Sequence, residues 1–294
     1  MTGRRSAAPR RSGFTLVEAV VVIVITGILG GIVVLFIRWP VQNYVDSVAR
    51  AELVDNADMA MRRMAREVRR ALPNSVRVSG GSAVEFIPTK TGGRYLAAED
   101  EIDPTANAGS GGSPALSFID PAALTFRVVG DMPTGQQAIV AGDAIVVYNL
   151  GPGFDRADAY TGANMATVAG VSNNVVSMSA NPFASGDPAT AGLSSPGRRF
   201  QVVNTPVMYV CDLAARSLTR MWNYAPSASM TVPPVSASLQ TALLATNVTE
   251  CSFSYSDLKN IHSALLGMTI GLRRLNNADP ALRLVHQVHV DNVP

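Results

Sequence analysis

The sequence predicts an α+β protein: a long N-terminal helix, first transmembrane and then amphipathic, packed on a mainly antiparallel β-sheet domain with long loops. Three observations favour this class. Residues 19–37 form an uninterrupted apolar run, and residues 41–72 carry apolar side chains at helical spacing. Beyond residue 73, short β-rich runs alternate with Gly, Pro, Ser, Asn and Asp. We therefore expect a long helix over 14–72 and a β-rich globular domain over 73–294.

Composition excludes several classes of protein. The 294 residues suffice for a sizeable core. A formal net charge of +2 gives no strong field to attract nucleic acid, which is therefore not an expected partner. The two cysteines, Cys211 and Cys251, form neither a small disulfide scaffold nor a zinc-binding pattern.

The apolar segment near the N-terminus is long enough to cross a membrane. A helix of about 20 apolar residues spans the hydrocarbon core, and residues 14–37 hold almost no polar side chains. Arginines precede this segment, so the positive-inside rule places the N-terminus in the cytoplasm and the rest of the chain outside. A cleaved secretory signal does not fit, because its apolar region spans about 7–15 residues and ends in an A-x-A-like site.

A single acid, Glu18, lies near the front of this apolar segment. A carboxylate at the centre of a membrane helix costs about 2.5–3.5 kcal/mol on insertion scales, and less near the headgroups. A plain single-span anchor gives no reason for such an acid. We therefore expect Glu18 to have a partner.

The stretch GFTLVE, Gly13 to Glu18, resembles the processing motif of type IV pilins and of the pseudopilins of type II secretion. The resemblance implies that a prepilin peptidase/methyltransferase removes residues 1–13 as a cytoplasmic leader. It would cut between Gly13 and Phe14 and then methylate the new amine of Phe14. It also implies that Glu18 pairs with the N-terminal amine of a neighbouring subunit, so that each charge compensates the other's desolvation.

The same resemblance implies a location and a set of partners. The chain would cross the inner membrane once, through about residues 14–37, with residues 73–294 in the periplasm. It would then enter a pilus or pseudopilus together with other minor and major pilins, through an inner-membrane assembly platform.

Beyond the membrane segment we expect the helix to continue to Leu72. Pro40 should kink or locally melt the helix rather than end it, and Pro73, Asn74 and Ser75 should end it. A cluster of arginines occupies positions 62, 63, 66, 69 and 70. A nucleic-acid patch is one interpretation, but interleaved aromatics are missing and nearby acids dilute the charge. A solvated helix face is favoured, and a contact with a neighbouring subunit is compatible with it.

The C-terminal part contains several runs with the composition of strands. They span residues 84–87, 123–129, 144–149, 200–203, 207–211, 218–224, 251–255, 266–275 and 284–290. The segments 105–114 and 157–197 are expected to be irregular loops that include an insertion between two halves of a sheet. GSGG at 109–112 is not a phosphate loop, because no GK[ST] follows it.

The two cysteines lie at the ends of expected strands. Runs 207–211 and 218–224 indicate a hairpin that turns at 212–217, so Cys211 ends its first strand and Cys251 begins a later strand. A periplasmic domain allows a disulfide between them. Two buried free thiols are the alternative, and the disulfide is favoured.

No motif points to catalysis. His286 and His289 are three residues apart, so on a strand they face opposite ways and cannot jointly hold a metal without a bulge. The sequence contains no H-E-x-x-H, no zinc-spaced cysteines and no G-x-S-x-G. Asp155 and Asp158 could ligate calcium from a loop, but their spacing does not match the twelve-residue calcium loop, so a polar loop is favoured. We expect no enzyme activity, no catalytic residue, no cofactor and no metal.

Three further stretches resemble the minor pilin-like proteins of mannose-sensitive haemagglutinin (MSHA) pilus biogenesis. They are residues 44–78, GDAIVVYNLG at 142–151 and LVHQVHVDNVP at 284–294. The size of the domain also resembles the J-type minor pseudopilins of type II secretion. The resemblance implies a low-copy subunit at or near a filament tip that helps to start assembly. An adhesin, a DNA-uptake pilin and a membrane-tethered periplasmic enzyme are the alternatives.

Overall fold

The computed structural model describes residues 13–98, 114–187, 189, 193–258, 262–274 and 281–294, apart from the side chains of Trp39 and Leu258. The expected leader up to residue 12, the GSGG stretch and residues 105–113 lie outside the described residues. The chain divides into two compact units, Met1–Val54 and Asp55–Pro294.

One long helix, α1, runs from Leu16 to Val68. It continues through Pro40, which therefore neither ends nor melts it. The helix ends at Val68 rather than at Leu72, because Ala71 and Leu72 form hydrogen bonds or bridges with the segment that follows β2. Ala71 forms an isolated bridge with Pro88, and Leu72 N–H donates to the carbonyl of Ile87 at 2.7 Å.

The second unit contains antiparallel strands in three sheets, which confirms the α+β class. In chain order the strands are β1 (Arg77–Ser79), β2 (Ala83–Phe86), β3 (Thr89–Tyr95), β4 (Thr125–Val129), β5 (Ala144–Val147), β6 (Met165–Ser172), β7 (Val175–Met178), β8 (Arg199–Val203), β9 (Val207–Asp212), β10 (Ser217–Trp222), β11 (Gln240–Thr246), β12 (Val248–Leu258), β13 (Ser263–Leu272) and β14 (Leu282–Asp291). A 3₁₀ turn, η3 (Gly135–Gln137), lies between β4 and β5.

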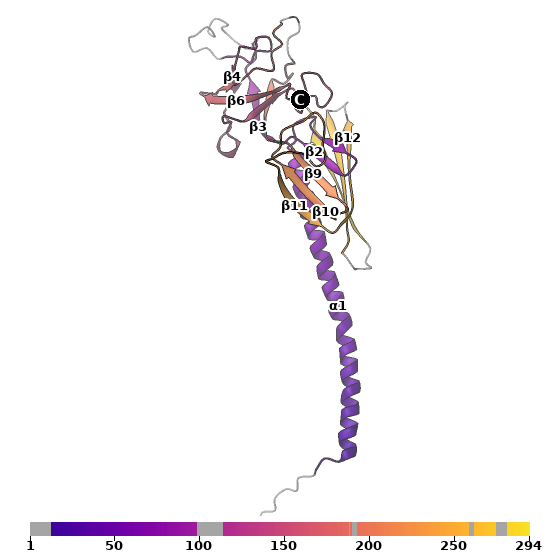
Figure 1. Cartoon of the computed structure of the whole chain (residues 1–294). Coiled ribbons are helices and arrows are strands. Elements are labelled where there is room, and N and C mark those ends of the chain that lie inside the picture. Colours follow the sequence, from indigo (N-terminus) through magenta and orange to yellow (C-terminus); the bar gives the residue numbers. More distant parts are fainter. Residues whose placement is uncertain (1–12, 99–113, 188, 190–192, 259–261, 275–280) are drawn as a thin grey trace, which may run out of the picture. The chain divides into compact units, whose positions relative to one another are not determined.

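The sheets follow a simple topology. A five-stranded sheet has the order β1-β2-β9-β10-β11, and a three-stranded sheet has the order β12-β13-β14. The remaining strands close a barrel in the order β3-β4-β7-β6-β5-β8. Strands β9, β10 and β11 lie side by side, while β3, β4 and β6 group away from them (Figure 1). Because β2 pairs with β9, the whole barrel is an insertion within the five-stranded sheet.

Every expected strand is present, with shifted bounds, and β9 and β10 form the expected hairpin. Strands β1, β3, β6, β7 and β11 have no counterpart among the expected runs. The expectation that 157–197 is irregular is wrong, because this segment contains β6 and β7 of the barrel. In β6 only Ala166 and Val168 are fully buried, so its sequence lacks the large alternating side chains that mark a strand.

Strand β3 was not predicted from the sequence because it contains Gly92 and Gly93. A Cβ on Gly92 would lie 2.9 Å from the carbonyl oxygen of Phe200, and one on Gly93 would lie 2.9 Å from the Phe200 ring. These residues therefore permit the close approach of β3 to β8. In the sequence, a Gly-Gly pair among polar residues indicates a turn rather than a strand.

The end of α1 and the two open sheets share one core. The buried helix residues recur at one-face spacing: Ala57, Ala60, Met61, Met64, Ala65 and Val68. They belong to the same cluster as Phe86 and Tyr209 of the five-stranded sheet and Met268 of the three-stranded sheet. The last part of the helix, from Ala57 to Val68, thus buries its apolar face within the second unit. The earlier apolar residues of the expected amphipathic stretch are exposed instead: Val41, Tyr44, Val45 and Val48.

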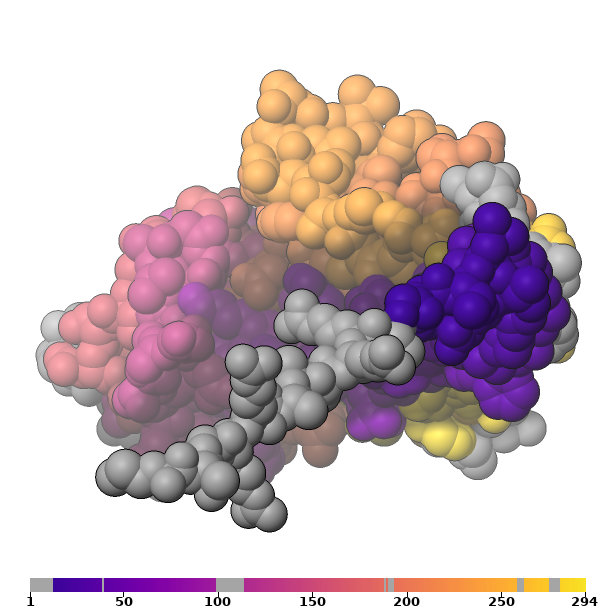
Figure 2. Space-filling view, turned by 90° about the horizontal axis from the view of Figure 1, so that it is seen from below, coloured from indigo at the N-terminus to yellow at the C-terminus, as the bar shows by residue number. Residues whose placement is uncertain are grey.

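The barrel has a separate core. Phe126 and Phe200 pack edge to face with ring centroids 5.3 Å apart, and both belong to a cluster that also holds Tyr95. In Figure 2 the pink residues of the barrel and the orange residues around β10 and β11 form neighbouring lobes of this unit's surface. The barrel is therefore a second packed body within the unit, filled by its own side chains.

A buried ion pair lies where these elements meet. Arg77 of β1 donates through Nε to the carboxylate of Glu85 on β2, which is 2% exposed. Arg77 also donates to the carbonyls of Ser227 and Ala228, at 2.8 and 2.9 Å. Its guanidinium lies 3.6 Å from the ring centroid of Tyr160.

Two tyrosines complete this ion-pair network. Tyr224 Oη donates to the Glu85 carboxylate at 2.8 Å, and Tyr160 Oη donates to the carbonyl of Ser75 at 2.8 Å. Burial, followed by the charge of Glu85, raises the pKa of both phenols well above the ordinary value. Both tyrosines therefore stay neutral donors.

Three asparagines connect distant segments beside this pair. Asn74 Nδ2 donates to the carbonyl of Asn149 at 2.8 Å, and Asn74 N–H donates to Asn292 Oδ1 at 3.0 Å. Asn149 Nδ2 donates in turn to the carbonyl of Pro73 at 2.7 Å. The segment after the helix, the barrel and the C-terminus are thereby joined by direct hydrogen bonds.

Cys211 of β9 and Cys251 of β12 are joined by a disulfide, with Cα atoms 6.3 Å apart and a sequence separation of 40 residues. The bond connects the five-stranded sheet to the three-stranded sheet. Both ends lie in the shared core or pack against it.

We predict that Arg77→Ala lowers the free energy of unfolding by about 3–5 kcal/mol, because it leaves Glu85 buried without its cation. Urea unfolding of the detergent-solubilised protein, followed by near-UV circular dichroism, measures this. Arg62→Ala is the control, since Arg62 pairs with Asp58 at the surface, and it should change stability by less than about 1 kcal/mol. Equal losses in both variants would contradict the assigned role of the buried pair.

We predict that replacing both cysteines by alanine lowers the free energy of unfolding by about 2–4 kcal/mol, because a 40-residue loop is released in the unfolded chain. Dithiothreitol should lower the urea midpoint of the unaltered protein and leave the double variant unchanged. If the reductant has no effect on the unaltered protein, the cysteines are free thiols under those conditions.

Candidate functional site

The start of α1 carries a capping box next to the expected cleavage point. Thr15 directly precedes the helix, and its Oγ1 accepts a hydrogen bond from Glu18 N–H at 3.3 Å. Thr-x-x-Glu is the capping-box pattern, in which the threonine satisfies an N–H of the first turn. The carboxylate of Glu18 lies in that turn, where the helix dipole favours negative charge. The helix therefore begins three residues after Gly13.

The apolar segment after the cap has no cover within the chain. Its large side chains are between 48% exposed, at Val21, and 81% exposed, at Phe36. Helix α1 is long and apolar enough to cross a membrane, and none of its most apolar window is buried, which is consistent with a single-pass anchor. A Cβ built on Gly27, Gly30 or Gly31 meets no atom within 4 Å, so nothing inside the chain requires these glycines.

The arginines at the end of α1 line a groove on the second unit, which we call the arginine groove. It has a volume of about 970 Å³. It is lined by Arg63, Arg66, Glu67, Arg69, Arg70, Pro88, Thr89, Asn204, Thr205, Val207, Arg220 and Trp222. Arg62 does not line the groove, and its Nε lies 2.6 Å from Asp58 Oδ2.

Glu67 is held inside this groove by arginines from two elements. Arg220 Nε of β10 donates to Glu67 Oε2 at 2.9 Å, and Arg63 Nε donates to Oε1 at 3.1 Å. Burial alone would raise the pKa of Glu67, but the hydrogen bond from Arg220 and the charge of Arg220 help to outweigh burial, so that the pKa is lowered. The guanidinium of Arg220 also lies 4.5 Å from the ring centroid of Trp222.

The expected solvated face is confirmed, because all five arginines of the cluster are exposed. Two of them also have partners: Arg63 pairs with Glu67, and Arg70 Nη2 donates to the carbonyl of Thr89 at 3.3 Å. Sequence analysis missed Arg220 and Trp222, which complete the groove from β10. No local signal could identify them, because Arg220 is 153 residues away from its partner Glu67.

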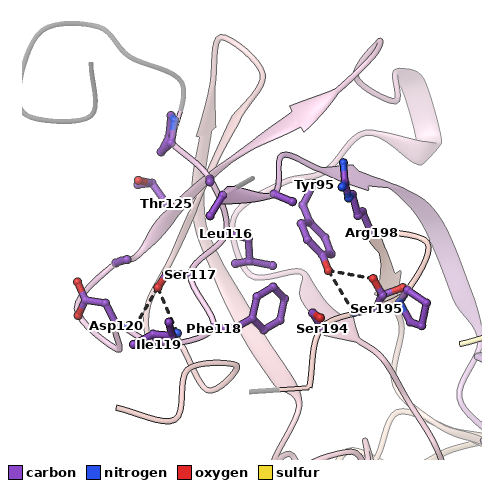
Figure 3. A pocket seen from close by; sticks show the side chains of 16 residues that line it. Tyr95, Leu116, Ser117, Phe118, Ile119, Asp120, Thr125, Ser194, Ser195 and Arg198 are labelled. Carbon is purple, nitrogen blue, oxygen red and sulfur yellow. Dashed lines mark hydrogen bonds between the residues drawn. The ribbon is translucent and has the colours of Figure 1, made fainter. Parts of the chain in front are cut away.

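A second hollow lies at the barrel, with a volume of about 760 Å³. Tyr95 Oη accepts from Ser195 N–H at 3.1 Å, and Ser117 Oγ accepts from Asp120 N–H at 2.9 Å (Figure 3). Asp120 Oδ1 accepts from Ala122 N–H in a local turn. These polar groups are used by the fold itself, and the described lining residues include no histidine or cysteine. They offer no nucleophile and base in contact.

The other residues considered from sequence are not brought together. His286 is partly buried and His289 exposed on the regular strand β14, so they face opposite sides. Asp158 is buried and its Oδ1 accepts from Tyr160 N–H at 2.9 Å, whereas Asp155 is exposed. The loop that carries them is exposed around Asp155 and buried from Ala157 to Tyr160. Among the described residues, no group of three or more His, Cys, Asp or Glu side chains is placed to hold a metal ion.

The segments that carry the MSHA resemblance do converge. Asn74 comes from the first stretch, Asn149 from the second and Asn292 from the third, and hydrogen bonds join Asn74 to both of the others. No spacing along the sequence predicts a contact among these segments. Their sequence separations are 75 and 218 residues.

Residues 8–34 match the family model described as the prokaryotic N-terminal methylation motif. The match covers the segment around Gly13, Phe14 and Glu18 and the first part of α1. This motif indicates a type IV pilin-like or pseudopilin protein, which is a structural class rather than a class of enzyme. Comparison with curated proteins and with solved structures finds no significant match in either set.

We predict that Glu67→Gln destabilises the protein at pH 7, and that this difference from the unaltered protein shrinks as the pH falls below 4.5. The folded-state pKa of Glu67 is lowered from 4.5, so the ionised carboxylate contributes stability above that pH. The contribution is lost as the pH falls through the folded-state value. Urea midpoints at pH 7 and pH 3 test this, with Asp58→Asn as the surface control. A constant difference at both pH values would show that charge is not the cause.

Proposed function

We propose that this chain is a minor pilin-like subunit that prepilin peptidase processes and that enters a type IV filament of the MSHA type, at or near its tip. The observation that carries the proposal is the methylation motif at residues 8–34, continued by an exposed apolar helix. Each step below follows from the chemistry that these residues make available.

Processing would act on the bond between Gly13 and Phe14. Removal of residues 1–13 gives Phe14 a free amine, which the methyltransferase activity of the peptidase then methylates. The capping box at Thr15 supports this arrangement, because the new terminus is followed at once by a stable helix start. The peptidase thus meets the Gly13–Phe14 bond ahead of the helix, outside regular secondary structure.

Assembly would satisfy the surfaces that the single chain leaves open. The exposed side chains of 14–37 need lipid or other apolar helices as cover. Gly27, Gly30 and Gly31 lack any partner inside the chain, and small residues allow helices in membranes to approach closely. Glu18 would pair there with the N-terminal amine of a neighbouring subunit, which gives its carboxylate a cation away from water.

The size and architecture of the second unit support the role of a minor subunit at or near the filament tip. An inserted barrel adds a packed body to the sheet domain, and a bulky domain is difficult to repeat along a narrow filament. A J-type minor pseudopilin of type II secretion is the alternative that the same observations support. The hollow at Tyr95 and Ser195 is the feature that an adhesin would need, and glycan binding by the purified protein would favour that function.

We predict that the protein from native membranes begins at Phe14 and carries one additional methyl group, because the motif directs cleavage after Gly13. Intact-mass spectrometry measures both features. Gly13→Ala should keep residues 1–13 and lack the methyl group. An uncut N-terminus in the unaltered protein would refute pilin-type processing.

Glu18→Gln separates assembly from processing in the same experiment. It should still be cut before Phe14 but should be absent from sheared filaments, since the amine of the neighbouring subunit loses its anion. The matched control is Glu52→Gln, which removes another exposed acid of α1 and should remain in the filament fraction. If the two variants enter filaments equally, Glu18 has no role in assembly.

A further inference from the structure

The arginine groove contains more arginines than are paired with acids of the same chain among the described residues. Its lining includes arginines at 63, 66, 69, 70 and 220 and a single acid, Glu67. Glu67 is satisfied by Arg63 and Arg220. The side chains of Arg66 and Arg69 are exposed and form no hydrogen bond or ion pair with any described residue. The groove therefore presents two unpaired guanidinium groups and an excess of cations.

The helix dipole accounts only for the arginines near the end of α1. Cations near the C-terminal end of a helix are favoured by the partial negative charge there, which accounts for Arg66 in the last turn of α1. It does not account for Arg220, which enters from β10. The other wall segments, Pro88–Thr89 and Asn204–Thr205, contain no acid, and a concave surface lined by one sign of charge concentrates its field.

The residues that line the arginine groove favour a ligand that carries negative charge and also has neutral hydrogen-bonding groups. Guanidinium forks bind carboxylates and phosphates in a bidentate manner. Thr89, Asn204 and Thr205 offer side chains that can pair with a peptide backbone. Nucleic acid would instead need free aromatic faces for its bases, but the aromatic ring of the groove, Trp222, is partly buried and has Arg220 over it.

We propose that the arginine groove docks an acidic peptide segment of another filament subunit, with its carboxylates on Arg66 and Arg69. The inference rests on the proposed function, because that function supplies the neighbouring subunit. Arg63, Glu67 and Arg220 form a pre-organised base for this contact, since their mutual bonds hold them in place before the partner arrives. The contact gives the second unit a specific partner surface outside the membrane helix.

Trp222 provides a reporter inside the groove. The chain has two tryptophans, so Trp39→Phe leaves Trp222 as the single tryptophan of the full chain in detergent. We expect hexaglutamate to change its fluorescence saturably, with affinity that falls as salt is raised, and hexaglutamine to leave it unchanged. Inorganic phosphate and a single-stranded oligonucleotide of equal charge should bind at least about tenfold more weakly than hexaglutamate, because neither supplies a peptide backbone for the polar walls.

Matched variants test which arginines are used. Arg66→Gln combined with Arg69→Gln should weaken hexaglutamate binding by about fivefold, since two exposed ion pairs are lost. Arg62→Gln removes a helix arginine that lies outside the groove and should leave binding unchanged. Equal weakening by both changes, equal binding of the oligonucleotide or phosphate, or no response to hexaglutamate would each overturn the proposal.

A cellular measurement separates this inference from the proposed function. A photo-crosslinking residue in place of Asn204 should capture a neighbouring subunit in filaments, and the Arg66→Gln/Arg69→Gln change should reduce the crosslink by about fivefold relative to Arg62→Gln. Intact mass reports cleavage before Phe14 in every sample. Normal cleavage with an undiminished crosslink refutes the docking site alone, whereas absent cleavage refutes the filament role as well.

Discussion

The buried pair between Arg77 and Glu85 is the constraint on which the second unit depends. A carboxylate that is 2% exposed needs a cation and further donors at fixed positions. Those groups come from β1, from the loop at Ser227 and Ala228 and from Tyr224, while the ring of Tyr160 lies against the guanidinium. Strands β1 and β2, the loop after β10 and the segment around Tyr160 must therefore take one arrangement for Glu85 to be tolerated.

The two units of the chain differ in how far their side chains find partners within the chain. In the second unit most apolar and polar groups find partners within the same chain, from the shared core to the Asn74, Asn149 and Asn292 contacts. In the first unit the large apolar side chains of residues 14–37 are exposed and have no cover within the described part of the chain. The arginine groove is an exception in the second unit, because its unpaired cations face outward from a firmly held base. A filament subunit needs both properties, a self-sufficient domain and surfaces that only neighbours complete.

The sequence predicted features whose cause is local. The membrane helix, the amphipathic stripe and strands such as β9 and β13 follow from the spacing of side chains along a single segment. Two of the strands it missed depend on distant neighbours. Gly92 and Gly93 lie in β3, which pairs with β8 so closely that a side chain at either position would meet Phe200. In β6 only Ala166 and Val168 are buried, and their cover comes from the rest of the barrel. Arg220 joins Glu67 across 153 residues, which no spacing rule can anticipate.

The sequence by itself determined the processing motif at Gly13 to Glu18, the apolar helix and the presence of an antiparallel β domain. These three features depend on residues that are adjacent in the sequence, so they can be recognised without knowledge of the folded chain. Only the tertiary structure decided that the insertion is a closed barrel, that three distant asparagines meet, and that helix and strand arginines share one groove. The physical reason is that burial and ion pairing are settled by neighbours in space, and those neighbours exist only once the chain has folded.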